Sequence, residues 1–268
     1  MTTTRPHIAA TATAAPATVE ILYCVPHASG DLPHWLEGRE TEVLATHEGY
    51  DIGAYDLAVE MAARTGGEVV AAVMSRTVID VNRMLNADAI PRCDQQGRPF
   101  AHNVGMKPGD LAARLDTWRG FHGDLGRTVE AALASGGVVL VDTHSFTRQL
   151  GEGAPRIVDI GVCAPEGGGF ALRLFRTLED LAASGRFLVQ DETGGRVPAI
   201  RLDEPYPGAH PGAFIGRTYH RPGVDTVTLE VCDDLLRSAQ AVDRVADLIV
   251  AAIAAALNSN QRRVPDAT

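Results

Sequence analysis

The stretch GGVVLVDTHS, residues 136–145, indicates the fold class of this 268-residue chain. It starts with two glycines, continues as an unbroken apolar run, and ends abruptly in Asp142, His144 and Ser145. The apolar run is typical of a strand, and all three residues that follow it can carry polar chemistry. In an open α/β sheet, ligands bind at the edge where strands end. The stretch therefore predicts a buried strand with a functional site at its end.

Similar apolar runs rich in Val and Ile recur along the chain, each bounded by Gly, Pro, Asp or Ser. They predict strands at Val19–Val25, Glu68–Met74, Gly137–Val141, Ile157–Cys163 and Thr226–Val231. Longer segments between them have helical periodicity: Ile52–Arg64, Asp110–Ala134, Ala171–Ala183 and Asp234–Leu257. This alternation predicts an α/β fold with a mixed, largely parallel sheet flanked by helices. Pro91–Pro108 and Thr193–Pro222 are rich in Gly, Pro and His, so we predict long functional loops there.

Length and composition predict one globular domain. With 45% hydrophobic and 22% charged residues, the chain can bury a large core. We expect this domain to span residues 19–258, between a disordered N-terminal tail at 1–18 and a C-terminal tail at 259–268. The first tail lacks the order of a signal peptide, and the apolar run Leu248–Leu257 is half the ~20 residues that a membrane helix needs. We therefore expect a soluble, cytoplasmic protein, whose oligomeric state the sequence leaves open.

Charge and cysteine content exclude several kinds of partner and site. The chain has 24 basic and 34 acidic residues, a formal charge of −10, and no basic cluster, which argues against nucleic acid as a partner. Cys24, Cys93, Cys163 and Cys232 form no CxxC pair, so we expect reduced, structural thiols. Any metal should therefore be held by histidine and carboxylate.

Two histidines follow predicted strands. His27 comes directly after Ile21–Val25 in VPHASG, and His144 follows the run described above. Asp142 is two residues before His144 on an extended segment, so it faces the same side and can orient the imidazole. The structural alternatives are a loop histidine at position 27 and a turn-capping role for Asp142.

A zinc hydrolase needs about three protein ligands, which leaves a carboxylate to be found. Asp51 and Glu48 are the nearest candidates. Asp51 stands at the start of a predicted helix, where its structural alternative is an N-cap.

Charged residues elsewhere suggest substrate contacts and a base. SRTVIDVNR, residues 75–83, combines Arg76, Asn82 and Arg83, which suit a bidentate grip on a substrate carboxylate. The alternative is a salt bridge from Asp80 to one of the arginines, which leaves the other for substrate. Glu230 lies on an apolar strand, where burial would raise its pKa toward that of a general base. Its alternative is an ordinary strand-edge glutamate facing water.

These segments, in this order, resemble the N-formylglutamate amidohydrolase family, part of a wider group of zinc carboxypeptidase-like and aspartoacylase-like α/β hydrolases. The resemblance runs from about Val19 to Val231. It rests on PHASG at 26–30, DIGAYDLA at 51–58, SRTVIDVNR at 75–83, VDTHS at 141–145, EPYPG at 204–208, FIGRTY at 214–219 and the TLE that ends in Glu230.

The resemblance implies a set of roles for these residues. Zinc would be bound by His27, Asp51 and His144, and Glu230 would control the water that attacks an amide carbonyl. Asn82 and Arg83 would hold the substrate's carboxylate, with Arg76 and Ser145 on the substrate side and Arg217 as a catalytic arginine. The implied substrate is an N-acyl amino acid or a related small amide.

Two departures from the family pattern concern the substrate. Gly212–Arg217 reads Gly-Ala-Phe-Ile-Gly-Arg where the family has Gly-Gly-aromatic-Ile-Thr-Arg, and the loop Asp88–Pro108 also differs. A paralogue that acts on another amide therefore stands beside N-formylglutamate as an alternative. A serine hydrolase is disfavoured because Ser29 and Ser145 lack the G-x-S-x-G turn. A non-catalytic binding protein of this fold is the remaining alternative.

Overall fold

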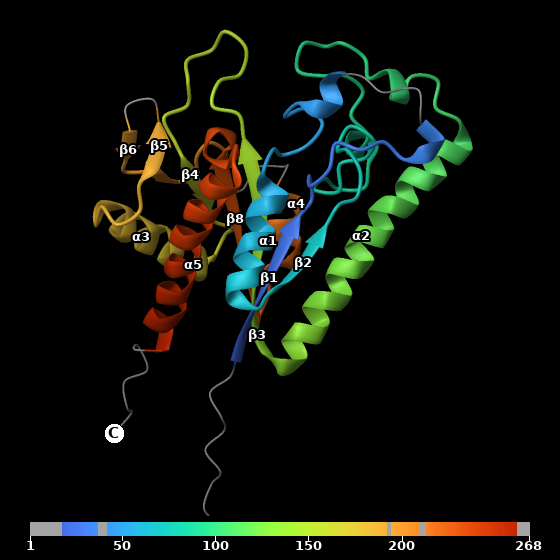
Figure 1. The fold of residues 1–268 in the computed structure, drawn as a ribbon. Helices are drawn as coiled ribbons and strands as arrows, with labels where there is room; N and C mark the ends of the chain where they lie inside the picture. Colours follow the sequence, from blue (N-terminus) through green and yellow to red (C-terminus); the bar gives the residue numbers. More distant parts are fainter. Residues whose placement is uncertain (1–17, 37–41, 192–193, 209–212, 262–268) are drawn as a thin grey trace, which may run out of the picture.

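A six-stranded sheet forms the centre of the protein in the computed structural model, which describes residues 18–36, 42–191, 194–208 and 213–261 (Figure 1). Its strand order is β2 (Glu68–Ala71), β1 (Thr18–Val25), β3 (Gly136–Phe146), β8 (Val224–Cys232), β4 (Ile160–Cys163) and β7 (Ile200–Leu202). The first four strands are parallel, β4 is antiparallel to β8, and β7 is parallel to β4. This arrangement confirms the predicted mixed, largely parallel α/β fold. A separate hairpin pairs β5 (Val189–Asp191) with β6 (Gly194–Arg196).

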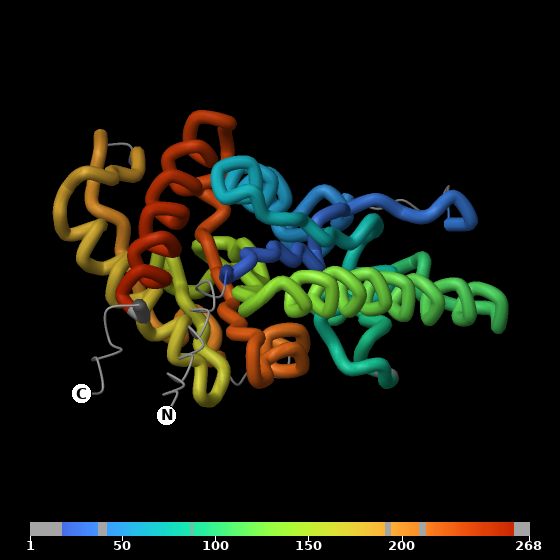
Figure 2. The backbone as a smooth tube through the Cα atoms, turned by 90° about the horizontal axis from the view of Figure 1, so that it is seen from below, coloured from blue at the N-terminus to red at the C-terminus, as the bar shows by residue number. Residues whose placement is uncertain are grey.

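Helices cover both faces of the sheet. The helices α1 (Ala54–Thr65), α3 (Gly169–Ala183) and α5 (Ala239–Gln261) share one apolar core with strand residues such as Val141 and Leu229. On the other face, α2 (Pro108–Ser135) and α4 (Phe214–Tyr219) pack over a second core that includes Leu140. Figure 2 shows α1 and α5 on one side of the sheet and α2 and α4 on the other.

The face under α2 and α4 changes from apolar to polar along β3 and β8. Because side chains alternate along a strand, Leu140 is followed on this face by Asp142 and then His144. Thr228 and Glu230 pair with Asp142 and His144 across the two strands. The carboxyl ends of these parallel strands therefore place two ionisable side chains next to each other at one edge of the sheet.

The structure corrects several predicted boundaries. β3 continues to Phe146, beyond the predicted end at Val141, because the polar side chains past Val141 are buried and bonded within the sheet edge. Thr193–Pro222 is wrong as a continuous loop: it contains β6, β7 and α4, which are too short to show periodicity. The helix predicted from Asp234 begins at Ala239, after a 3-10 turn at Asp233–Leu236.

The ends of the chain are only partly described. Residues 1–17 and 262–268, which include most of both predicted tails, lie outside the described residues. α5 continues to Gln261, past the predicted domain end at 258. Within the described part, no helix has both the length and the apolar character needed to cross a bilayer. The four cysteines are unpaired, as expected, and only Cys93 is exposed.

Candidate active site

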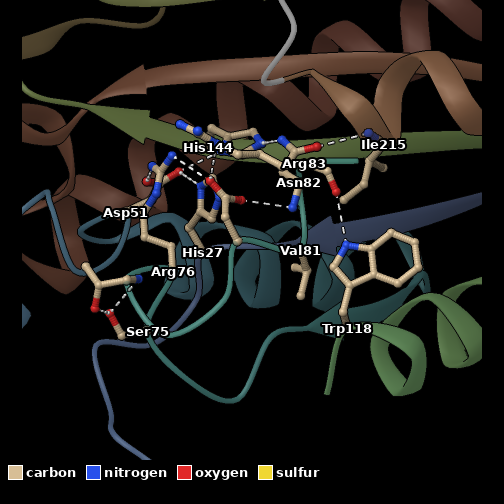
Figure 3. Close-up of polar contacts among 12 residues, drawn as sticks. His27, Asp51, Ser75, Arg76, Val81, Asn82, Arg83, Trp118, His144 and Ile215 are labelled. Atoms are coloured by element: carbon tan, nitrogen blue, oxygen red, sulfur yellow. Dashed lines mark hydrogen bonds and ion pairs between the residues drawn. The ribbon is translucent and has the colours of Figure 1, made fainter. Parts of the chain in front are cut away.

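Three predicted metal ligands converge at the carboxyl edge of the sheet (Figure 3). Asp51 Oδ2 lies 2.7 Å from His144 Nδ1 and 3.3 Å from His27 Nδ1, and one ligand atom from each residue fits within 4.8 Å of the others. All three side chains are buried. His27 follows β1, His144 is in β3, and Asp51 precedes α1, so distant segments of the chain build the cluster.

Local backbone geometry brings Asp51 to the cluster. Its amide donates to the His27 carbonyl at 2.9 Å, which ties the start of α1 to the end of β1. Gly53, the N-cap of α1, has φ of 77°. A side chain there would be strained in this left-handed conformation and would also collide with Leu236. The turn that presents Asp51 therefore requires glycine at position 53.

Two further carboxylates lie behind the histidines. His27 Nε2 lies 2.8 Å from Asp80 Oδ1, and His144 Nε2 lies 3.1 Å from Asp142 Oδ1. With Nε2–H donating to Asp80, the Nδ1 lone pair of His27 faces Asp51, an arrangement that needs a proton or a cation between the two groups. The hydrogen-bond partner of His144 Nε2 is Asn82 Nδ2, so Asp142 acts on His144 through its charge. Ligands of tetrahedral zinc lie roughly 3.3 Å apart, close to the His27–Asp51 separation. The donor set and its supporting carboxylates therefore fit zinc.

Opposing effects of burial and charge act on the cluster. Burial alone would raise the pKa of Asp51, but His27 and His144 outweigh it and hold that pKa well below its usual range. Burial likewise opposes the charged form of His144, yet Asp142 and Asp51 raise its pKa well above the ordinary value. The cluster thus keeps an ionised carboxylate and attracts positive charge, as a cation site should.

Glu230 lies on β8 opposite His144. It is buried, and burial raises its pKa to about 8. A carboxyl group with such a pKa can accept and return a proton near neutral pH. The structure therefore excludes the alternative of a strand-edge glutamate facing water.

The segment after β2 carries the predicted substrate-binding residues and is organised by Asp80. Besides His27, Asp80 accepts hydrogen bonds through Oδ2 from Arg76 at 3.3 Å and from Arg83 at 3.0 Å. Arg76 also reaches Asp51 Oδ1 at 3.4 Å. Asn82 places Nδ2 3.0 Å from His144 Nε2 and accepts at Oδ1 from the Ile215 amide at 2.9 Å. One buried carboxylate thus links a candidate ligand to both arginines.

Helix α2 fixes this segment from behind. Arg114, Trp118 and His122 are spaced four residues apart and so share one stripe of the helix. The three side chains bond to backbone carbonyls of the segment: Arg114 Nη1 to Val78, Trp118 Nε1 to Arg83 at 3.0 Å, and His122 Nε2 to Val81 at 2.8 Å. Sequence reasoning missed this stripe, although its spacing inside a predicted helix was visible.

A cavity of about 240 Å³, here called the first cavity, collects the predicted residues. It is lined by every predicted site residue except Arg217. Cys163, Tyr206, Pro207, Ala213 and Thr228, none of which was predicted as a site residue, also line it. They come from β4, β8 and the segment between β7 and α4, where no local sequence pattern distinguishes a cavity wall from ordinary packing.

The remaining predicted residues have other surroundings. Ser145 lines the cavity, but its hydroxyl donates to the Ile52 carbonyl at 2.8 Å. Arg217 lies on the exposed side of α4 with Nε donating to the Ala213 carbonyl at 3.3 Å. Glu48 accepts from the Gln95 amide at 3.2 Å and is outside the three-residue cluster. The geometry therefore favours Asp51 over Glu48 as ligand and Arg76 over Arg217 beside the cluster.

The family assignment follows from comparison with known proteins. A model of the N-formylglutamate amidohydrolase family matches residues 19–237, most of the chain. The chain belongs to this family. No curated protein matches the chain significantly.

Solved structures share the fold. A gene product of Agrobacterium tumefaciens is 23% identical, with a TM-score of 0.77 over 91% of this chain and 93% of that one. N-formylglutamate amidohydrolase from Ralstonia eutropha JMP134 is 17% identical, with a TM-score of 0.63 over 93% and 96% of the two chains. The family match supports amidohydrolase activity for this chain. The likeness to the two solved structures shows that they share its fold.

Proposed function

We propose that this member of the N-formylglutamate amidohydrolase family is a zinc-dependent hydrolase of an N-acyl amino acid. The observation that carries the proposal is the convergence of His27, Asp51 and His144 in the cavity that Glu230 also lines. A metal-ligand set and a carboxyl group with a raised pKa are the two parts that amide hydrolysis by water requires. The unpaired cysteines agree with a cytoplasmic location.

His27, Asp51 and His144 would hold the zinc ion. Zinc bound there would act as a Lewis acid on the amide carbonyl, lower the pKa of the attacking water and favour the ionised form of Glu230. Asp80 would keep Nδ1 of His27 free for the metal by accepting the proton on Nε2.

The chain's own residues would carry the proton and the charge. Glu230 would accept a proton from the attacking water and pass it to the leaving nitrogen, so that the amine departs neutral. Arg76, which contacts Asp51 and lines the cavity, would stabilise negative charge that develops on the carbonyl oxygen. Loss of such a donor typically costs ~3 kcal/mol of transition-state stabilisation.

Arg83 and Asn82 would hold the substrate's carboxylate. Arg83 uses Nε for Asp80 and Nη1 for the Asp88 carbonyl, which leaves guanidinium hydrogens for substrate. Asn82 is fixed by His144 and Ile215, so it would set the distance between the anchored carboxylate and the cluster. An amino acid released from its acyl group carries such a carboxylate, which is why we favour N-acyl amino acids over simple amides.

A substrate panel with metal control tests this function. The purified protein would be assayed for release of amine from N-formyl, N-acetyl and free amide derivatives of acidic amino acids, before and after treatment with a chelator. We expect hydrolysis that disappears with the metal and returns when zinc is added. Hydrolysis undiminished after complete metal removal would contradict the proposal.

A further inference from the structure

A second cavity adjoins the first. Its volume is about 280 Å³, and it shares Asp51, Arg76, Arg83, Ser145 and Tyr206 with the first cavity. If the released amino acid occupies the first cavity, beside Asn82, the acyl group points past Arg76 into the second. A formyl group, one carbon and its oxygen, would leave almost all of that volume unfilled. The second cavity is therefore large enough for a longer acyl chain.

Arg156 lines the second cavity, and within the described residues its side chain contacts only neutral groups. Its Nη1 donates to the Thr147 carbonyl at 3.2 Å and its Nη2 to the Tyr206 hydroxyl at 3.2 Å. Its guanidinium carbon lies 5.5 Å from the Phe146 ring centroid and 5.1 Å from that of Tyr206. Among the residues that the structure describes, no carboxylate lies within ion-pair distance of it. The Phe146 and Tyr206 rings pack against the Arg156 guanidinium and fix its orientation, while some of its N–H groups stay available to donate to a ligand.

The other arginines of this cavity differ, because their charge is already balanced. Arg76 pairs with Asp51 and Asp80, and Arg83 pairs with Asp80. Thus the cavity offers one half-buried cation that lacks a counter-charge in the described chain.

The carboxylates of the second cavity do not supply that counter-charge. Asp51 and Asp80 bond to the histidines and arginines described above, Glu48 accepts from the Gln95 amide, and Asp94 pairs with Arg98 at 2.6 Å. A chain with a net charge of −10 has many acidic side chains that could neutralise an arginine. A cation kept unpaired in a cavity is suited to bind an anionic ligand, since burial strengthens a charge-assisted hydrogen bond.

We propose that the second cavity is the subsite for the acyl group and that Arg156 selects an acyl group ending in a carboxylate. The substrate class would then be N-acyl amino acids whose acyl part is a dicarboxylic acid. This inference rests on the proposed function, which supplies the orientation of the substrate. Arg156 acts here as a specificity-determining residue, remote from the bond that is cleaved.

Matched acyl pairs test the inference. N-malonyl-L-glutamate would be compared with N-propanoyl-L-glutamate, and N-glutaryl-L-glutamate with N-pentanoyl-L-glutamate, because each pair differs only by a terminal carboxylate in place of methyl. We expect kcat/KM to be at least about 10-fold higher for the acid-terminated member of at least one pair, as one charge-assisted hydrogen bond would give. In Arg156→Met that ratio should fall by about 10- to 100-fold, and Arg156→Lys should restore part of it.

Arg119→Met serves as the matched control, because Arg119 is an exposed arginine paired with Asp116, and neither residue lines the first or the second cavity. Its ratio should equal that of the parent. Equal use of both members of each pair by the parent, or an unchanged ratio in Arg156→Met, would overturn the inference.

Calorimetric binding separates this inference from the proposed function. If neither these four amides nor the N-formyl and N-acetyl derivatives above are hydrolysed, the proposed function fails, and binding of the four amides to the parent and to Arg156→Met then decides the subsite alone. Tighter binding of the acid-terminated member that depends on Arg156 supports the subsite. Equal binding within each pair refutes it.

Discussion

Replacing Trp118 with phenylalanine tests whether helix α2 positions the substrate anchor. The change removes one hydrogen bond, from Trp118 Nε1 to the Arg83 carbonyl at 3.0 Å, and keeps an aromatic ring (Figure 3). That ring packs against His122 at 4.0 Å and Phe214 at 6.0 Å between centroids. Arg83 itself is unchanged, so any effect on substrate must pass through the position of its backbone.

The expected magnitude follows from one neutral hydrogen bond. Such a bond contributes about 0.5–1.5 kcal/mol net, and each 1.4 kcal/mol is tenfold in an equilibrium constant. If the bond is lost and Arg83 holds substrate and transition state equally, KM should rise by about 2- to 12-fold while kcat stays near that of the parent. The smaller ring should also lower the free energy of unfolding by about 1 kcal/mol.

Steady-state kinetics and thermal unfolding, measured on the same preparations, separate the two effects. Trp35→Phe is the matched control: the Trp35 ring lies beside Arg114, with 5.3 Å from guanidinium carbon to ring centroid, and bonds to no carbonyl of the 78–83 segment. We expect it to lower stability without raising KM. A parental KM in Trp118→Phe, or an equal rise in the control, refutes the positioning role.

Three further perturbations probe the framework. Asp80→Asn keeps an oxygen that can accept from His27 but removes the negative charge that pairs with Arg76 and Arg83. Zinc affinity, measured by competition with a chelator, should therefore fall by ~10–100-fold, and an unchanged affinity would contradict this expectation. Asp159 is buried, and although burial opposes its ionisation, Arg196 and Arg148 lower its pKa. The stability that the ionised Asp159 contributes is therefore present above pH ~4 and is lost as pH falls through the folded-state pKa. Asp159→Asn should therefore lower the free energy of unfolding at pH 7 by ~3 kcal/mol, and denaturation at lower pH should show this gap narrowing rather than staying constant. In Gly161→Ala the added methyl group would overlap the Glu204 carbonyl oxygen, so this change should lower the melting temperature. The methyl group of Gly120→Ala on α2 would point into open space, so that change should not lower it.

The sequence was informative where chemistry follows a regular strand. His27 and His144 were predicted at strand ends because apolar runs stop there abruptly, and the structure has both at the same edge of the sheet. Glu230 was noticed because a carboxylate interrupts an apolar strand. In each case the information lay in the position where an apolar run stops or is interrupted by a polar residue.

Other parts of the site depend on tertiary packing that no local pattern encodes. Arg156 and Tyr206 meet only because the segment after β3 folds against the segment after β7. The choice between Asp51 and Glu48 depended on a turn set by Gly53. The resemblance implied that Arg217 is a catalytic arginine, but its side chain is exposed on the short helix α4 and does not line the first cavity.

The most direct test of the central claim measures zinc content and turnover together, on the same preparations of Glu230→Gln and Asp51→Asn. We predict about one zinc per chain in the parent. Glu230→Gln should retain it while kcat falls by ~10²–10⁴-fold, because a base acts in the transition state and need not bind the metal. Asp51→Asn should lose zinc and activity in parallel. A metal-free Glu230→Gln, or an Asp51→Asn that is fully loaded with zinc yet inactive, would contradict the assignment of base and ligand.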